Sequence, residues 1–92
     1  MILEIVTPEA TLLKTDVESV SVPGINGEFQ MLNNHAAIVS VLTAGKVRFK
    51  GNGIQIEETY QEKFEKIDDE YTLRIASGTV EMKQNKIIVL AD

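Results

Sequence analysis

Residues 16–32 read DVESVSVPGINGEFQML, and this stretch decides the fold class. Valine and serine alternate over residues 19–22, a period of two that is typical of a strand with one buried face. Pro23–Gly27 has turn chemistry, because Gly and Asn tolerate positive φ and proline fixes its own φ. The alternation then resumes over Glu28–Leu32. The stretch therefore predicts a strand, a tight turn and a second strand.

The rest of the chain repeats this pattern of short apolar runs separated by Gly, Pro and Asn. Including the stretch above, the expected strands are Ile2–Val6, Asp16–Val22, Glu28–Leu32, Ile38–Leu42, Lys46–Lys50, Tyr71–Ala76, Thr79–Met82 and Ile87–Ala91. The last run is apolar on both faces, so we expect it in the interior. Such closely spaced strands predict an all-β protein, an antiparallel β-sandwich of about eight to ten strands. The 92 residues are enough for a single domain, residues 1–92.

One segment, residues 59–67, does not follow the strand pattern. Its apolar residues recur at i, i+4 and i+7, which favours a short helix. Thr59 and Glu62 match a capping box at its start. Two turns are too short to be stable alone, so such a helix must pack on the sheet. A longer hairpin arm is the alternative interpretation.

The charge is concentrated in one part of the chain. The formal net charge is 9 − 14 = −5, which argues against binding to nucleic acid. Residues 57–70 contain seven acids and two lysines, and the remainder is balanced at seven acids and seven bases. We expect this acidic segment to be a solvated face. No apolar run is long enough for a membrane helix, so direct membrane insertion is not expected.

Residues that carry chemistry are sparse. His35 is the only histidine, and no cysteine is present, so neither a thiolate nor a multi-histidine metal site is expected. Asp68–Glu70 lacks the alternating ligands and central glycine of a calcium loop. We expect no catalytic residues, no cofactor and no enzyme. The residues alone indicate a small β module for binding or structure.

Three stretches carry more information than their periodicity. They are residues 6–9 (VTPE), the run from Val20 to Ala36 (VSVPGINGEFQMLNNHA) and the run from Ser77 to Asp92 (SGTVEMKQNKIIVLAD). Their order and spacing resemble the N-terminal β-sandwich domain of the epsilon subunit of bacterial and chloroplast F-type ATP synthases. The resemblance covers the chain except about residues 51–70, which look like an insertion.

The resemblance implies a non-catalytic rotor component of the central stalk. In that family the sandwich links the gamma subunit to the polar loops of the c-subunit ring and helps couple proton translocation to ATP synthesis. We therefore expect a peripheral protein at the cytoplasmic face of the bacterial inner membrane, reached through its partners. The balanced charge outside the acidic segment predicts a mostly apolar gamma contact with little dependence on salt.

The resemblance also assigns partner-binding residues on the c-ring side. Glu28 follows a glycine-rich turn at the place where the family's acid meets the polar loop of the c subunit, and His35 is expected near the same edge. The plainer interpretations are an ordinary exposed strand carboxylate and a structural histidine. Residues 33–37 read NNHAA where the family has Pro-Gly-His-Ala-Pro, yet Asn tolerates the left-handed backbone that the turn needs.

Longer family members continue into two C-terminal helices that can inhibit ATP hydrolysis and, in some, bind ATP. With its last residue at Asp92, we expect the short form without the helical domain, which couples without inhibiting and binds no ATP. Two other classes stay open. One is a free-standing module that binds carbohydrate or peptide through exposed aromatics, and the other an acid–base enzyme using Asp68 or Glu70 near His35.

Overall fold

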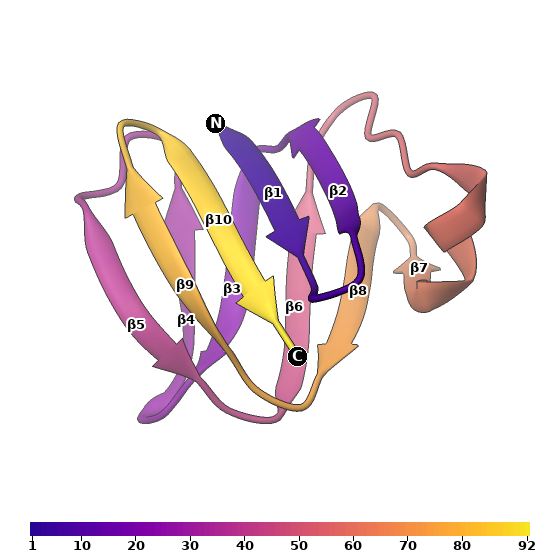
Figure 1. Ribbon diagram of the computed structural model, residues 1–92. Helices are drawn as coiled ribbons and strands as arrows, with labels where there is room; N and C mark the ends of the chain where they lie inside the picture. The colour runs from indigo at the N-terminus through magenta and orange to yellow at the C-terminus, as the bar shows by residue number, and fades with distance from the viewer.

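Ten strands and one short 3₁₀ helix make up the chain in the computed structural model, which describes residues 1–92 (Figure 1). The strands are β1 (Ile2–Val6), β2 (Thr11–Asp16), β3 (Ser19–Gly24), β4 (Gly27–Leu32), β5 (Ile38–Leu42), β6 (Gly45–Lys50), β7 (Phe64–Ile67), β8 (Glu70–Ile75), β9 (Gly78–Lys83) and β10 (Lys86–Ala91). The 3₁₀ helix η1 spans Glu58–Lys63. The predicted all-β class is confirmed.

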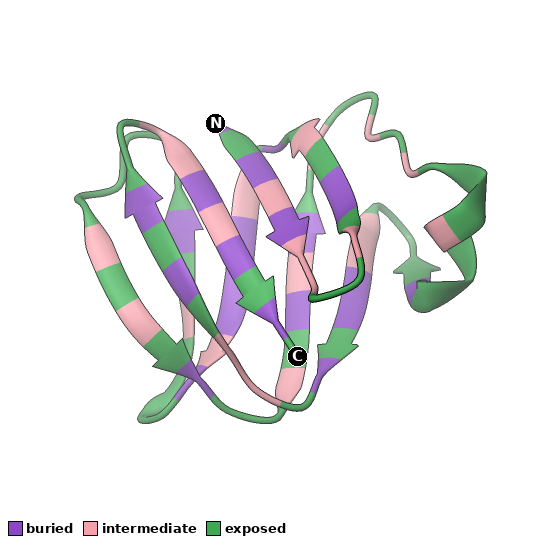
Figure 2. Ribbon diagram, viewed as in Figure 1, coloured by how far each residue is buried: buried purple, intermediate pink, exposed green.

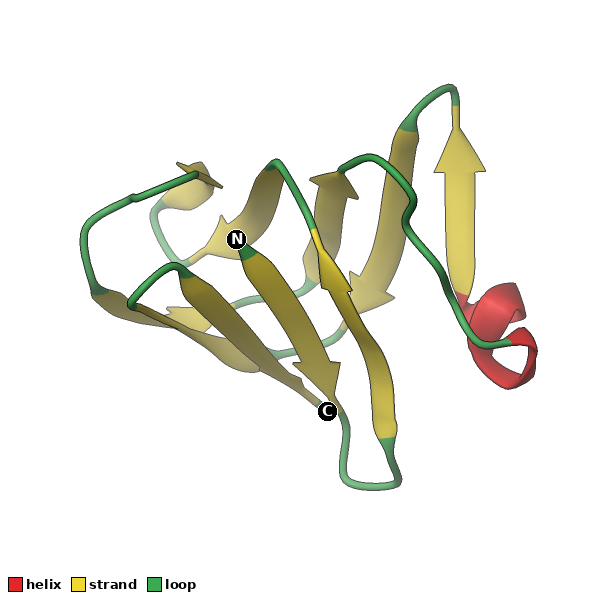
Figure 3. Cartoon of the chain, turned by 90° about the horizontal axis from the view of Figure 1, so that it is seen from above, coloured by secondary structure: helices red, strands yellow, loops and turns green.

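The strands form two layers that face each other, as the view from above shows (Figure 3). The first layer has the order β2-β1-β10-β9-β5, and the second has the order β4-β3-β6-β8-β7. The layers are joined where Gly24 of β3 pairs with Leu42 of β5. Every strand pair is antiparallel except β1 with β10, which is parallel.

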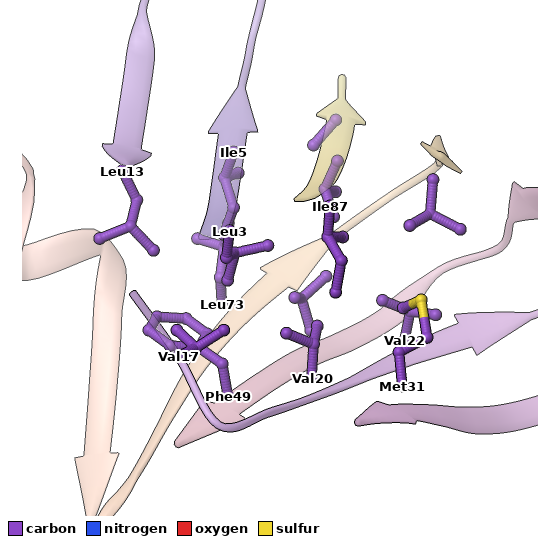
Figure 4. Close-up of a cluster of buried hydrophobic side chains, with 14 of the residues drawn as sticks. Leu3, Ile5, Leu13, Val17, Val20, Val22, Met31, Phe49, Leu73 and Ile87 are labelled. Carbon is purple, nitrogen blue, oxygen red and sulfur yellow. The ribbon is translucent and has the colours of Figure 1, made fainter. Parts of the chain in front are cut away.

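The core lies between the layers. Alternation along the strands turns every second side chain inward, so buried and exposed bands alternate in Figure 2. Figure 4 shows side chains of the first layer meeting those of the second; the labelled ones are Leu3, Ile5, Leu13, Val17, Val20, Val22, Met31, Phe49, Leu73 and Ile87. Twenty buried apolar residues form this single cluster. Fully burying one aliphatic or aromatic side chain contributes about 1.5–3 kcal/mol, so this cluster is the main source of the fold's stability.

Segment 59–67 divides between a helix and a strand. The helix ends at Lys63 in 3₁₀ form, and the next four residues pair with β8 as β7. Phe64 is 8% exposed, and its ring packs edge-on against Phe49 at 5.9 Å between centroids. This tertiary contact outweighs the helical periodicity. The helix prediction therefore holds for the first part of the segment and the extended alternative for the second.

The predicted capping box is wrong. The helix begins after Glu57, two residues earlier than a Thr59 cap requires, and it has no side-chain capping hydrogen bond.

Strand β2 does not follow from the alternation rule, because its neighbouring residues Leu12 and Leu13 are both buried. The register between β1 and β2 shifts between Ile5, which pairs with Leu13, and Val6, which pairs with Thr11. Leu12 is therefore the extra residue of a β-bulge, and the bulge allows two adjacent leucines to enter the core.

Strand β10 is covered on one face only. Ile87 and Val89 are fully buried, whereas Leu90 is 51% exposed. The expectation of burial on both faces is wrong: β10 lies between β1 and β9 within its layer, and its outer face is open.

Candidate interaction surfaces

Glu28 is positioned by a tight hairpin between β3 and β4. Gly24 and Gly27 pair at the base of the turn, and Gly27 has φ +117°, a conformation that L side chains rarely adopt. A Cβ added to Gly24 would lie 2.8 Å from the ring of Phe29, so this position also needs glycine. Glu28 is the next residue of β4, and its side chain is 45% exposed.

Arg48 of β6 lies between two carboxylates. Its Nη2 donates a hydrogen bond to Glu28 Oε1, and its Nη1 lies 3.5 Å from Glu70 Oε1. The hydrogen bond to Glu28 is the largest influence on the Arg48 pKa, which is raised above its ordinary value despite partial desolvation. The guanidinium is therefore a permanent cation, and it compensates much of the Glu28 charge.

The surroundings of Arg48 fix its side chain on the outer face of the second layer. In the sheet Arg48 pairs with Ser21 on one side and Thr72 on the other, and both of these polar residues are buried. The Nε atom of Arg48 is buried and has no hydrogen-bond partner. The guanidinium thus directs its terminal nitrogens toward the carboxylates even though one donor stays unpaired.

His35 lies in the loop between β4 and β5, after the end of β4. It is exposed; its Nδ1 is 2.7 Å from the carbonyl oxygen of Ala36, and its backbone N–H donates to Leu32. Asn34 has φ 63°, as expected for an asparagine in this turn. Glu28 is the second residue of β4, and the four residue steps from it to Leu32 span about 13 Å. Glu28 therefore lies near the start of β4 and His35 beyond its other end, so the two residues are not side by side as expected.

The outer face of the first layer carries apolar side chains on β5, β10 and β1, with Thr79 and Glu81 of β9 between them and Glu4 of β1 beside Ile88. We call Val6, Val39, Val41, Ile88 and Leu90 the apolar face. Val39 is 74% exposed, Val41 55% and Leu90 51%. The register aligns Val41, Thr79, Leu90 and Val6 in one row across the four strands. The exposed bands of β5 and of the end of β10 are visible in Figure 2.

A shallow recess of about 460 Å³ continues the apolar face toward the end of β10. Its lining includes Val6, Val41 and Leu90. At its polar side, the hydroxyl of Ser77 donates a hydrogen bond to the Asp92 carboxylate. The recess thus offers a partner an apolar surface with one polar border.

The five aromatic side chains do not form a sugar- or peptide-binding surface. Phe49 and Phe64 are buried, and Phe29, Tyr60 and Tyr71 pack against the core. Tyr71 stacks on Phe49 with ring centroids 5.6 Å apart. The exposed aromatics on which a free-standing carbohydrate- or peptide-binding module would depend are not found.

The residues of the acid–base alternative are also dispersed. Leu32, just before the His35 loop, shares a row with Glu70, and three strand spacings separate them, about 14 Å. Asp68 lies in the turn between β7 and β8 with φ 57°. No group of three or more His, Cys, Asp or Glu is placed to hold a metal ion. The geometry supports contact surfaces and no proton-transfer pair.

Comparison with known proteins decides the family. All of residues 1–92 match the family described as the ATP synthase Delta/Epsilon chain, beta-sandwich domain. The chain belongs to this family. The sequence resemblance to the epsilon subunit, and its limitation to the β-sandwich domain, are confirmed.

Curated relatives of this epsilon-type domain carry the name ATP synthase epsilon chain. The relative from Desulfitobacterium hafniense is 38% identical over 98% of this chain and 57% of its own length. The relative from Chlorobaculum tepidum is 36% identical over 98% of this chain and 86% of its own length. The chain thus spans little more than half of the first relatives it matches and most of another.

Solved structures share the fold of this epsilon-type domain. A chain from the Tetrahymena thermophila mitochondrial ATP synthase, central stalk and c-ring, has a TM-score of 0.73 at 14% identity and covers 99% of this chain and 62% of its own. A chain from the Euglena gracilis mitochondrial ATP synthase, OSCP/F1/c-ring, has the same TM-score at 17% identity, over 99% of this chain and 49% of its own. In the epsilon-type domain itself, no helix has the length and apolarity to span a membrane.

Proposed function

We propose that this chain is a non-catalytic rotor component of an F-type ATP synthase, where it links the gamma subunit to the c-subunit ring and helps couple proton translocation to ATP synthesis. The observation that carries the proposal is the family match over residues 1–92, with relatives named ATP synthase epsilon chain that align over 98% of the chain. In this proposal the chain lies peripherally at the cytoplasmic face of the bacterial inner membrane, which it reaches through its partners.

The gamma subunit occupies the apolar face in this proposal. Three of its side chains, Val39, Val41 and Leu90, are more than half exposed, and they lie on β5 and β10 of one layer, with β9 between these two strands. Permanent subunit interfaces are more apolar than the remaining surface and bury roughly 2,000 Å² or more in total. The apolar face and the adjoining recess supply the apolar part of such an interface.

Co-purification with gamma on a sizing column tests this assignment. We expect a stable complex whose dissociation constant changes less than about threefold between about 50 mM and about 500 mM salt, because apolar contacts are not screened. A steep loss of affinity at high salt would contradict an apolar contact. Self-association of the chain through the same face, seen on the column without gamma, would favour a second copy as its occupant.

The c-ring contact is assigned to Glu28 in this proposal, and its support is the half-exposed carboxylate beside a tight glycine turn. Glu28→Lys is expected to lower proton-driven ATP synthesis in membranes and leave the fold intact. This variant also places an ammonium beside Arg48, so the matched control is Glu28→Lys with Arg48→Glu, which restores an ion pair. If the Glu28 carboxylate itself meets the ring, both variants lose synthesis; normal synthesis in both would contradict the contact.

His35 remains a predicted ring contact as well. Since it lies beyond the other end of β4, one ring surface that touches both residues must extend along the whole strand. His35→Ala therefore tests the extent of the ring contact, and its loss of synthesis is expected to be smaller than that of Glu28→Lys.

A further inference from the structure

Glu28 is not held by its own strand or by the neighbouring strand. Its carboxylate is bound by Arg48, which lies 20 residues later in the chain and two strands away in the sheet, across β3. The same guanidinium lies 3.5 Å from Glu70 on β8. The three charged side chains thus form one diagonal row over β4, β3, β6 and β8.

An exposed glutamate at a hairpin normally samples several rotamers, and a partner that binds it must order the side chain. The planar guanidinium of an arginine restricts the orientation of a bound carboxylate more than the ammonium of a lysine does, because its N–H donors lie in one plane. The Arg48 guanidinium is itself restricted, because its Nε is buried and its Nη1 is paired with Glu70.

We propose that Arg48 is a positioning residue, which holds the Glu28 carboxylate in the orientation that meets the c-ring. The proposal rests on the proposed function, in which Glu28 is the ring contact. Arg48 binds Oε1 and compensates the charge, so Oε2 remains as the acceptor for a partner. The matching group on the ring is therefore a hydrogen-bond donor, such as an amide or hydroxyl, and needs no full positive charge.

A double-mutant cycle tests the proposal, measured as affinity for a purified rotor of gamma and c-ring and as proton-driven ATP synthesis. Glu28→Gln and Arg48→Met are each expected to weaken rotor binding, Arg48→Met by about two- to tenfold, the cost of ordering one released side chain. Because Arg48 acts through Glu28, the double variant is expected to bind no worse than Glu28→Gln alone. Arg74→Met removes one positive charge from the same outer face and is expected to bind like the parent.

The outcomes separate the positioning role of Arg48 from the ring contact of Glu28. Normal binding by Arg48→Met while Glu28→Gln binds weakly overturns the positioning role and leaves the ring contact standing. The positioning role is also overturned if the double variant loses affinity by the product of the two single losses, because Arg48 then acts independently of Glu28. Normal binding by Glu28→Gln overturns the Glu28 contact and the inference with it. Arg48→Lys keeps the positive charge but removes the guanidinium, and it serves as a second variant if Arg48→Met does not fold. It is expected to bind the rotor with an affinity between those of the parent and Arg48→Met.

Discussion

The two outer faces of the sandwich follow the same strand alternation and differ in how their exposed side chains are grouped. The first layer exposes the apolar face, with Val39 and Leu90 open to solvent. The second layer exposes a row of ion-paired side chains, Glu28, Arg48 and Glu70. Both layers present the same kind of apolar inner face to one core. The difference shows that the inner faces specify the fold, and the outer faces are free to serve different partners.

Neither outer face contributes much to folding. Ion pairs between partly exposed groups stabilise proteins by about 0–1 kcal/mol, and an apolar side chain that remains exposed gains little from the hydrophobic effect. The stability of the fold therefore does not account for either surface; in the proposed function the first layer makes an apolar contact and the second an oriented polar contact.

The largest expected effect compares the two faces of β10 itself. Ile87→Ala removes a fully buried side chain and is expected to lower the free energy of unfolding by about 2–5 kcal/mol. Leu90→Ala, three residues later on the outer face, is expected to lower it by less than about 1 kcal/mol. Urea unfolding of both variants measures the contrast. Equal losses would mean that the apolar face is part of the folding core and not a free surface.

Much of this contrast follows from sequence alone. The alternation of Thr79–Met82 identifies the inward side chains correctly, and that of residues 19–22 identifies Val20 and Val22, because side-chain direction alternates locally along a strand. The burial of Ser21 on the outer face does not follow from this alternation. The outer face of Ile87–Ala91 cannot be read in this way, since an apolar side chain looks the same in the sequence whether or not a second layer covers it. A bulge such as that at Leu12 also hides a strand, because it breaks the local period.

The Arg48 contact is the part of the site that sequence reasoning missed. The pattern of Lys46–Lys50 indicates that Arg48 faces outward, but its partner depends on the order of β4, β3 and β6 in the sheet. That order is a long-range property with no local signal. Glu28 was found only through the family resemblance, which says nothing about what holds its side chain.

The next effect tests the apolar face directly. Val41→Glu with Leu90→Glu places two charges in the proposed gamma contact, where they lose water without gaining partners. We expect gamma affinity to fall by at least about thirtyfold, roughly 2 kcal/mol. Lys46→Gln with Arg74→Gln changes the net charge by the same two units on the second layer and is expected to bind gamma normally. If both double variants bind gamma equally well, the apolar face is not the gamma contact.

The smallest expected effect concerns the stability of the charged row. Arg48→Met is expected to change the free energy of unfolding by about 0–1 kcal/mol, because the ion pairs are partly exposed and the variant also removes the buried, unpaired Nε. The folded-state pKa of Arg48 is raised, so its contribution is fully present below the unfolded-state pKa and is lost only as pH rises through the folded-state pKa. Both values lie far above pH 10. Urea unfolding of parent and variant should therefore show the same small difference at about pH 7 and about pH 10. A difference well above 1 kcal/mol would mean that the row holds the second layer together, and its placement of Glu28 would then be a by-product of folding.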